Sequence, residues 1–178
     1  MEAYRWKTAV VTLSDKGYHG EREDKSGPLI QEIMSEEGYD IVENVLLPDE
    51  QDMIERELIR LSDEAHMDLI FTTGGTGFAE RDRTPEATLH VGERNAPGIA
   101  DAIRYYSLQV TPRAMLGRGV SVIRGKTLIV NLPGSPKAVR ESLGFILPSL
   151  GHGLAVLTGR EEECGRPDPL HRKACSRK

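Results

Sequence analysis

Two acidic residues stand in short motifs that could carry out nucleotide chemistry. Asp49 lies in Pro48-Asp49-Glu50, and Asp82 lies between two arginines in Arg81-Asp82-Arg83. Carboxylate oxygens are the ligands that Mg²⁺ takes beside nucleotide phosphates, so both residues are candidate metal ligands. A carboxylate before a helix is also a common N-cap, and a neighbouring arginine can simply form an ion pair with it. Taken alone, each acidic residue is therefore either a metal ligand or a structural residue, as an N-cap or an ion-pair partner.

A glycine-rich segment, Gly74-Gly75-Thr76-Gly77, follows Thr73 at the end of an apolar run. Glycines let the backbone approach a phosphate closely, and the hydroxyls of Thr73 and Thr76 add hydrogen-bond donors. The alternative is an ordinary tight turn from a strand to a helix. The segment matches neither the dinucleotide-binding fingerprint nor the Walker pattern, since no Gly-Lys-Ser/Thr follows it. Its position between an apolar strand and an acidic loop favours phosphate binding over a turn alone.

A second candidate anion site opens the last long helix at Pro133-Gly134-Ser135-Pro136-Lys137. The amides of Gly134 and Ser135, the Ser135 hydroxyl and the Lys137 charge could together bind an anion. A serine N-cap followed by proline explains the same residues equally well.

The sequence offers no convincing catalytic nucleophile. Its five histidines have no cysteine or serine partner at a recognisable spacing. Cys164, His171 and Cys175 could be three zinc ligands, but their spacing matches no closed structural zinc site.

The elements that must position these residues follow from the apolar pattern. Runs rich in β-branched residues predict strands at 8–13, 41–47, 68–73, 120–124 and 127–131. Apolar residues at helical spacing predict helices that contain Leu29, Ile54, Ile99 and Val139, the last ending at Pro148. Gly125-Lys126 joins the last two strands as a type II′ turn. This alternation predicts an α/β fold, a mostly parallel sheet with helices on both faces and one local antiparallel hairpin.

Ligands of an open parallel sheet bind outside the carboxyl ends of its strands. Ser14 and Asp15 follow the first strand, Asp49 follows the second, 73–82 follow the third and 131–135 follow the last. Four loops therefore converge on one edge of the sheet, which is the predicted site.

Length and composition narrow the class of protein. The 178 residues suit one domain, which we expect at 1–158, followed by a polar tail at 159–178. The net charge of −5 and the single Trp argue against binding to nucleic acid. The chain has no run of 18 apolar residues, and its first residues are polar, which argues against a membrane span and against secretion. We expect a cytoplasmic protein.

Six motifs occur in the order seen in one known family. The sequence resembles the MogA/MoaB-type molybdopterin adenylyltransferases of molybdenum-cofactor biosynthesis, which are related to the G domain of gephyrin. The resemblance extends from Thr8 to Gly153. The motifs that carry it are Leu13-Ser14-Asp15, Asp24-Lys25-Ser26-Gly27-Pro28, Thr73-Gly74-Gly75-Thr76-Gly77, Arg81-Asp82-Arg83-Thr84-Pro85-Glu86-Ala87, Pro97-Gly98-Ile99 and the run from Arg124 to Ala138.

The resemblance implies an activity. Such a protein transfers AMP from Mg²⁺-bound ATP to the terminal phosphate of molybdopterin and releases pyrophosphate, ahead of molybdate insertion. It implies a homotrimer and a possible molybdenum-insertion partner protein. The alternatives are a pterin-binding carrier or scaffold without activity, and a nucleotide hydrolase like the related competence-damage proteins, which would need further domains.

The resemblance also implies residue roles. Asp49 and Asp82 are the catalytic, magnesium-associated carboxylates. The glycine-rich loop is the nucleotide or phosphate cradle, and Ser135 with its neighbours binds an anion of the pterin or the nucleotide. Together with the positions singled out above, the expected substrate- or nucleotide-binding residues are Ser14, Asp15, Thr73, Gly74, Gly75, Thr76, Gly77, Pro133, Gly134, Ser135 and Lys137. The sequence departs from the family at Leu116-Gly117-Arg118, where Leu-Ser-Arg is frequent, and at Val122, where a glycine is usual.

Overall fold

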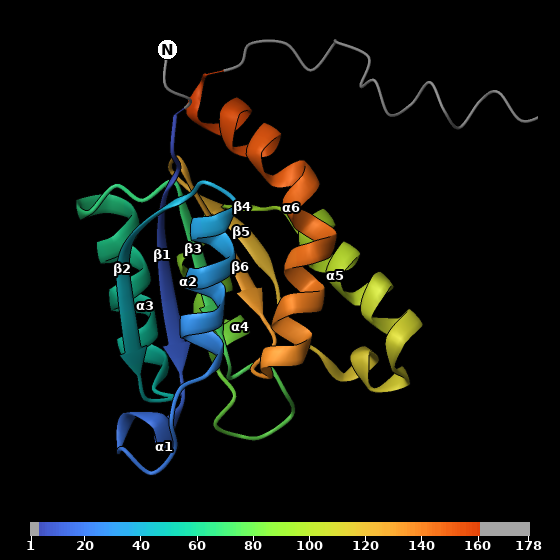
Figure 1. Cartoon of the computed structure of the whole chain (residues 1–178). Helices are drawn as coiled ribbons and strands as arrows, with labels where there is room; N and C mark the ends of the chain where they lie inside the picture. Colours follow the sequence, from blue (N-terminus) through green and yellow to red (C-terminus); the bar gives the residue numbers. More distant parts are fainter. Residues whose placement is uncertain (1–3, 161–178) are drawn as a thin grey trace, which may run out of the picture.

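A six-stranded sheet forms the centre of the structure, a computed structural model that describes residues 4–160 (Figure 1). The strand order is β2-β1-β3-β6-β5-β4. β2, β1, β3 and β6 are parallel, and β5 runs antiparallel to both β6 and β4. The strands are β1 (Lys7–Leu13), β2 (Asp40–Leu47), β3 (Leu69–Thr73), β4 (Arg94–Asn95), β5 (Ser121–Arg124) and β6 (Thr127–Leu132). The predicted α/β fold is confirmed, and the two-residue edge strand β4 is an addition to it.

Helices cover both faces of this sheet (Figure 1). They are α1 (Asp15–Tyr18), α2 (Ser26–Glu36), α3 (Gln51–Ile59), α4 (Thr84–Val91), α5 (Pro97–Val110) and α6 (Pro136–Thr158). A π-helical turn, η1 (Arg60–Glu64), continues α3, and a 3₁₀ turn, η2 (Pro112–Leu116), follows α5.

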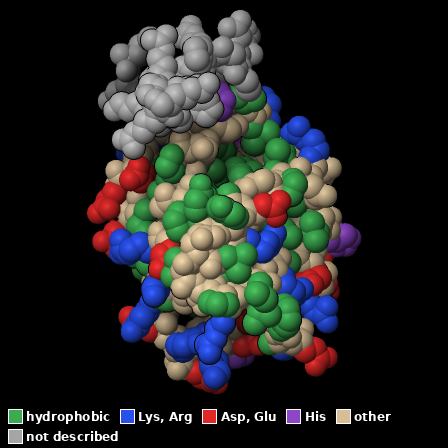
Figure 2. All heavy atoms as spheres, turned by 90° about the vertical axis from the view of Figure 1, so that its right-hand side faces the viewer, with side chains coloured by type: hydrophobic (Ala, Val, Ile, Leu, Met, Phe, Trp, Pro, Cys, Tyr) green, Lys and Arg blue, Asp and Glu red, His purple; other side chains and the backbone are tan. Residues whose placement is uncertain are grey.

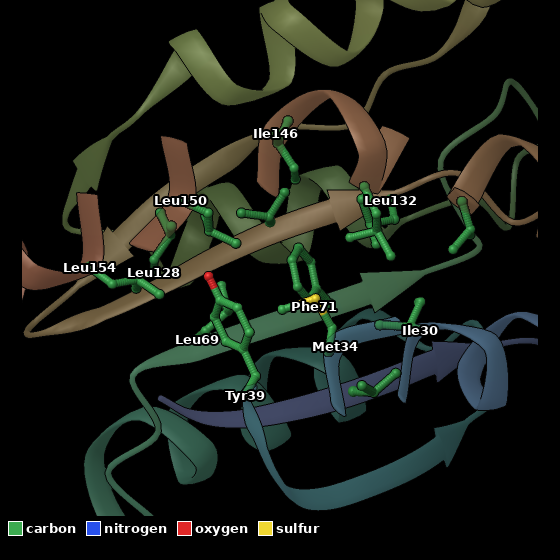
Figure 3. Close-up of a cluster of buried hydrophobic side chains, with 14 residues drawn as sticks. Ile30, Met34, Tyr39, Leu69, Phe71, Leu128, Leu132, Ile146, Leu150 and Leu154 are labelled. Atoms are coloured by element: carbon green, nitrogen blue, oxygen red, sulfur yellow. The ribbon is translucent and has the colours of Figure 1, made fainter. Parts of the chain in front are cut away.

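The core has two parts, one on each face of the sheet. In β1, Val10 packs into one part while Ala9 and Val11 pack into the other, because successive strand side chains point to opposite faces. The first part lies between the sheet and helices α2 and α6, where Met34 and Phe71 are fully buried (Figure 3). The second lies under α3 and α4. Burial on both faces fixes the central strands, and so fixes the loops at their carboxyl ends.

Helix α6 corrects one expectation. It does not end at Pro148 but continues to Thr158. Proline removes the amide that would bond to the carbonyl of Gly144, at a cost of about 3 kcal/mol. Leu150 and Leu154 are buried beyond the proline, and burying two leucines stabilises the helix by roughly 3–6 kcal/mol, which offsets that cost.

The two described ends of the chain meet at the amino edge of the sheet. The guanidinium of Arg160 lies 3.4 Å from the centre of the Tyr4 ring. Cys164, His171, Cys175 and the rest of the expected polar tail fall outside the described residues.

Within residues 4–160, no helix is long and apolar enough to cross a membrane. The expected cytoplasmic location stays a prediction.

Candidate functional site

A cleft of about 620 Å³ opens at the carboxyl edge of the parallel strands. It brings together residues from all four predicted loops, and these are Ser14, Asp49, Thr73, Gly74, Gly75, Asp82, Gly134 and Ser135. The prediction that four loops converge on one edge of the sheet is therefore confirmed. The functional roles of these residues stay predictions at this point.

Asp49 is held at the cleft by a reciprocal pair of hydrogen bonds with Asp15. The amide of Asp15 donates to Asp49 Oδ2, and the amide of Asp49 donates to Asp15 Oδ1, both at 3.0 Å. The helix-cap interpretation is wrong for Asp49, because the N-cap of α3 is Glu50 and no side chain caps that helix. The second oxygen, Asp49 Oδ1, is buried and has no hydrogen-bond partner among the described residues. A buried carboxylate oxygen without a partner is costly unless a ligand satisfies it.

The surroundings of Asp49 disfavour its charge. Burial raises the pKa of Asp49, and the nearby carboxylates of Asp15 and Asp82 raise it further. The Asp15 amide and the Arg81 guanidinium act in the opposite direction without cancelling the effect. A bound cation would relieve both the burial cost and the repulsion.

Asp49→Asn is expected to raise the melting temperature of the ligand-free protein at neutral pH. Folding raises the pKa of Asp49, so the folded state binds its proton more tightly, and ionised Asp49 costs stability as pH rises through the folded pKa. Below the unfolded pKa of about 3.9 the carboxyl is neutral in both states, and the gap between variant and wild type closes. Melting curves between about pH 4 and pH 8 test this. A gap that widens on acidification would contradict it.

Arg81 connects the loop that carries Asp82 to the loops around Asp49. Its Nε and Nη2 donate to the two oxygens of Asp15 at 2.9 and 2.8 Å, and its Nη1 pairs with Glu50 at 2.8 Å. The hydrogen bonds from Arg81 hold the pKa of Asp15 below its ordinary value. Both Asp15 oxygens are thus engaged by the protein, so this carboxylate positions its neighbours in the ligand-free structure.

Asp82 is available for a ligand. Its Oδ2 accepts a hydrogen bond from the amide of Ala79 at 3.0 Å. Within residues 4–160 neither flanking arginine pairs with it, since Arg81 bonds elsewhere and Arg83 donates to a backbone carbonyl. The N-cap of α4 is Arg83 rather than Asp82. The ion-pair and cap interpretations are therefore both wrong for Asp82.

The glycine-rich loop lies directly against the carboxylates. Gly74 and Gly75 have φ angles of 95° and 61°, in the left-handed region that favours glycine. A Cβ on Gly75 would lie 2.9 Å from Asp49 Oδ1, and one on Gly77 would lie 2.8 Å from Asp82 Oδ2. Gly74, Gly75 and Gly77 have no side chain, which lets this loop pass close to both carboxylates.

The two threonines of this segment differ in position. The hydroxyl of Thr73 donates to the carbonyl of Pro133 at 2.8 Å, which joins the third and fourth loops. Thr76 and Pro133 line a second cavity of about 250 Å³, between β6, α5 and the start of α6. Gly75 and Gly134, their immediate neighbours in the sequence, line the first cleft, so one wall separates the two cavities.

Ser135 is the N-cap of α6, and its Oγ accepts a hydrogen bond from the amide of Ala138 at 3.2 Å. The cap interpretation is confirmed. Because the hydroxyl oxygen accepts in this bond, the hydroxyl can still donate its proton to a ligand in the cleft. Lys137 does not line the cleft. Its side chain is 82 % exposed, and its Nζ lies 4.0 Å from Glu141.

Residues 22–26 form one wall of the cleft. The motif Asp24-Lys25-Ser26-Gly27-Pro28 contributes to the family resemblance, but the sequence alone assigned these residues no role in the site. Asp24 accepts hydrogen bonds from the amides of Ser26 and Gly27, both at 3.0 Å, and from the hydroxyl of Thr12 at 2.6 Å. Arg22 and Lys25 add two cations to the cleft. The spacing of Asp24 from the start of α2 is the local signal that could have revealed this turn.

Comparison with known proteins places the chain in a family. Residues 9–152 match the family described as the probable molybdopterin binding domain. Over 152 residues the chain is 43 % identical to a molybdopterin adenylyltransferase of Helicobacter pylori strain J99, covering 84 % of this chain and 86 % of that one. An Escherichia coli K12 protein of the same name is 43 % identical over 149 residues, 82 % of this chain and 76 % of its own length.

The structural comparison points the same way. The crystal structure of the molybdopterin biosynthesis enzyme MoaB from Thermus thermophilus superposes with a TM-score of 0.83 at 47 % identity, covering 86 % of this chain and 97 % of that one. The family match at residues 9–152 covers the sheet, both helical layers and all four loops of the cleft. The resemblance carried by the ordered motifs is confirmed, and the chain belongs to the probable molybdopterin binding domain family.

Proposed function

We propose that this chain is a molybdopterin adenylyltransferase, which transfers AMP from ATP to the terminal phosphate of molybdopterin and releases pyrophosphate. The observation that carries the proposal is the pair of available carboxylates, Asp49 with its unpartnered buried oxygen and Asp82 with no ion pair among the described residues, in one cleft beside a glycine-rich loop. The names of the relatives supply the substrate.

Asp49 and Asp82 fit Mg²⁺. No group of three or more His, Cys, Asp or Glu side chains in residues 4–160 is placed to hold a metal ion by itself. Mg²⁺ does not need such a cage, because it is usually held by one or two carboxylates together with substrate phosphates and water. The bound ion would neutralise part of the phosphate charge as the two substrates approach.

The chain's own residues would align two polyanions. The attacking group is a phosphate oxygen that is already ionised at neutral pH, so no general base is required. Arg22 and Lys25 supply positive charge along the cleft. The Ser135 hydroxyl and the amino end of α6 face the same space. In this proposal one substrate binds in each of the two adjoining cavities, with the wall formed by the third and fourth loops between them.

The decisive experiment incubates the purified protein with molybdopterin, ATP and Mg²⁺ and identifies the products by mass spectrometry. We expect adenylylated molybdopterin and pyrophosphate, formed only when all three reactants are present. AMP released without molybdopterin would indicate a nucleotide hydrolase. Tight binding of molybdopterin without any product would indicate the alternative function, a carrier or scaffold.

Ser135→Ala is expected to weaken substrate affinity more than it weakens the fold. Losing the cap costs about 1 kcal/mol of stability. Losing a charge-assisted hydrogen bond to phosphate costs about 1.5–3 kcal/mol, or roughly ten- to a hundredfold in affinity. Melting temperature and calorimetric Kd for molybdopterin, measured on the same sample, separate the two effects. A lower melting temperature with unchanged Kd would make Ser135 a cap without a role in binding.

The oligomer is proposed to be a homotrimer, whose product passes to a molybdenum-insertion partner protein. Exposed apolar side chains on α5 and η2 support association, and they include Tyr105, Val110 and Met115. Figure 2, which looks from the side of α5, shows hydrophobic side chains gathered on this face. Light scattering is expected to give three times the chain mass of 19.7 kDa. A mass of 19.7 kDa at micromolar concentration would contradict the trimer.

A further inference from the structure

Arg118 makes an unusual number of contacts with a segment far from it in sequence. It lies between η2 and β5, and its side chain is about two-thirds buried. Its backbone amide donates to the carbonyl of Thr76 at 3.0 Å, and its Nε donates to the carbonyl of Gly77 at 2.7 Å. Its Nη2 donates to the carbonyl of Asp82 at 2.5 Å. One side chain therefore holds both ends of the loop 77–82.

The fourth contact of Arg118 fixes the guanidinium itself. Its Nη1 forms an ion pair with Glu86, in the first turn of α4. Burial would raise the pKa of Glu86, but the Arg118 guanidinium outweighs it and the pKa lies below its ordinary value. The other Glu86 oxygen is buried without a hydrogen-bond partner in the described structure, so this carboxylate depends on Arg118. Arg118 is thus anchored to a helix while it holds the loop.

The loop has little else to keep it in place on this side. The Asp82 carboxylate bonds to Ala79, which belongs to the same loop. Phe78, also in the loop, is 70 % exposed and adds little packing. Arg81 holds the opposite side through Asp15 and Glu50. At its base, Thr84 donates from its amide to the carbonyl of Gly75 at 3.2 Å and from its hydroxyl to the carbonyl of Gly74 at 3.0 Å. Without Arg118, the loop 77–82 itself would be held only at this base and through Arg81, and it would open more readily.

We propose that Arg118 is a positioning residue for Asp82, and that it fixes the loop 77–82 so that the Asp82 carboxylate stays aimed into the cleft. The proposal rests on the function proposed above for the role of Asp82 in the reaction. Arg118 lines neither cavity, so it acts through the loop rather than on substrate.

Arg118→Gln and Arg118→Lys test this proposal against a matched control, Arg124→Gln. Arg124 also pairs with a carboxylate, Asp63, and donates to one carbonyl, that of Val91. It lies at the far end of β5, next to the turn that joins β5 to β6. Both glutamine variants therefore lose a similar set of contacts, and only one of them touches the loop.

Four quantities are measured on each variant, namely kcat and KM for adenylyl transfer, the melting temperature, and the hydrogen-exchange rates of amides 77–82. For Arg118→Gln we expect kcat to fall about 10- to 100-fold while KM for molybdopterin changes little. We expect amides 77–82 to exchange at least about tenfold faster, with other segments unchanged. Arg118→Lys, which keeps the charge but loses the fork geometry, should recover part of kcat. Arg124→Gln should lower the melting temperature as much as Arg118→Gln does, without affecting kcat or the exchange of amides 77–82.

An Arg118→Gln kcat within about twofold of wild type would overturn the proposal. So would a fall in kcat without faster exchange of the loop. If the wild-type protein forms no adenylylated molybdopterin, the proposed function fails, and loop exchange alone decides the inference. Faster exchange at 77–82 would then support a positioning role for Arg118, and unchanged exchange would overturn it.

Discussion

Asp82→Asn is expected to reduce kcat for adenylyl transfer by about 10²–10³-fold while the protein stays folded. The amide oxygen of asparagine can still accept the hydrogen bond from Ala79, so the local structure survives. What it cannot supply is the negative charge that binds Mg²⁺ beside the substrate phosphates. Within residues 4–160 Asp82 forms no ion pair, so its neutralisation leaves no partner cation unpaired. The loss therefore falls directly on the proposed reaction.

Steady-state kinetics across a range of Mg²⁺ concentrations measures this loss. Asp63→Asn is a suitable control, since Asp63 is a half-exposed carboxylate on η1 that pairs with Arg124 and lines neither cavity. The control should keep wild-type kcat. Near wild-type turnover of Asp82→Asn, with the same Mg²⁺ dependence, would mean that Asp82 has no metal role.

Gly74→Ala is expected to cost the largest amount of stability among single changes at the site. An added Cβ would lie 2.3 Å from the backbone carbonyl oxygen of Leu13, and β1 is buried on both faces and cannot move away. The φ of 95° adds backbone strain for any residue with a side chain. Overpacking and strain together cost about 2–5 kcal/mol, which corresponds to a fall of roughly 10 °C in melting temperature.

Gly144→Ala is the matched control for this change. Gly144 lies on the exposed side of α6, and an added Cβ would meet nothing within 4 Å. Alanine is the better helix former by up to about 1 kcal/mol, so this variant should melt at the same temperature or higher. Equal melting temperatures for the two alanine variants would show that the turn at Gly74 can relax, and that the close approach to Leu13 is unimportant.

Local patterns account for much of the fold and for the location of the cleft. Unbroken β-branched runs such as 8–13 indicated strands buried on both faces, and the Gly125-Lys126 turn indicated the hairpin. Knowing that parallel strands end at one edge was enough to bring Asp49, Gly75 and Ser135 into one site. Each of these inferences needs only neighbouring residues or a general rule of topology.

The partners of charged side chains could not be read in the same way. Arg81 lies next to Asp82 in sequence but bonds to Asp15 and Glu50, which reach it from other strand ends. Arg118 bonds to a loop about 40 residues earlier. Such pairs depend on where distant backbones meet, and the sequence of one chain holds no local signal for them. The course of α6 beyond Pro148 was missed for a related reason, because burial of Leu150 and Leu154 outweighs a local rule.

The contact between Tyr4 and Arg160 has a consequence for protein engineering. Both lie at the amino edge of the sheet, while the cleft lies at the carboxyl edge. A short peptide could join the two positions, and new ends could be opened in an exposed turn, to give a circular permutant with the cleft untouched. By the same geometry, the unit from Tyr4 to Arg160 can be inserted into a host protein through two adjacent junctions, and the cleft of the unit stays open.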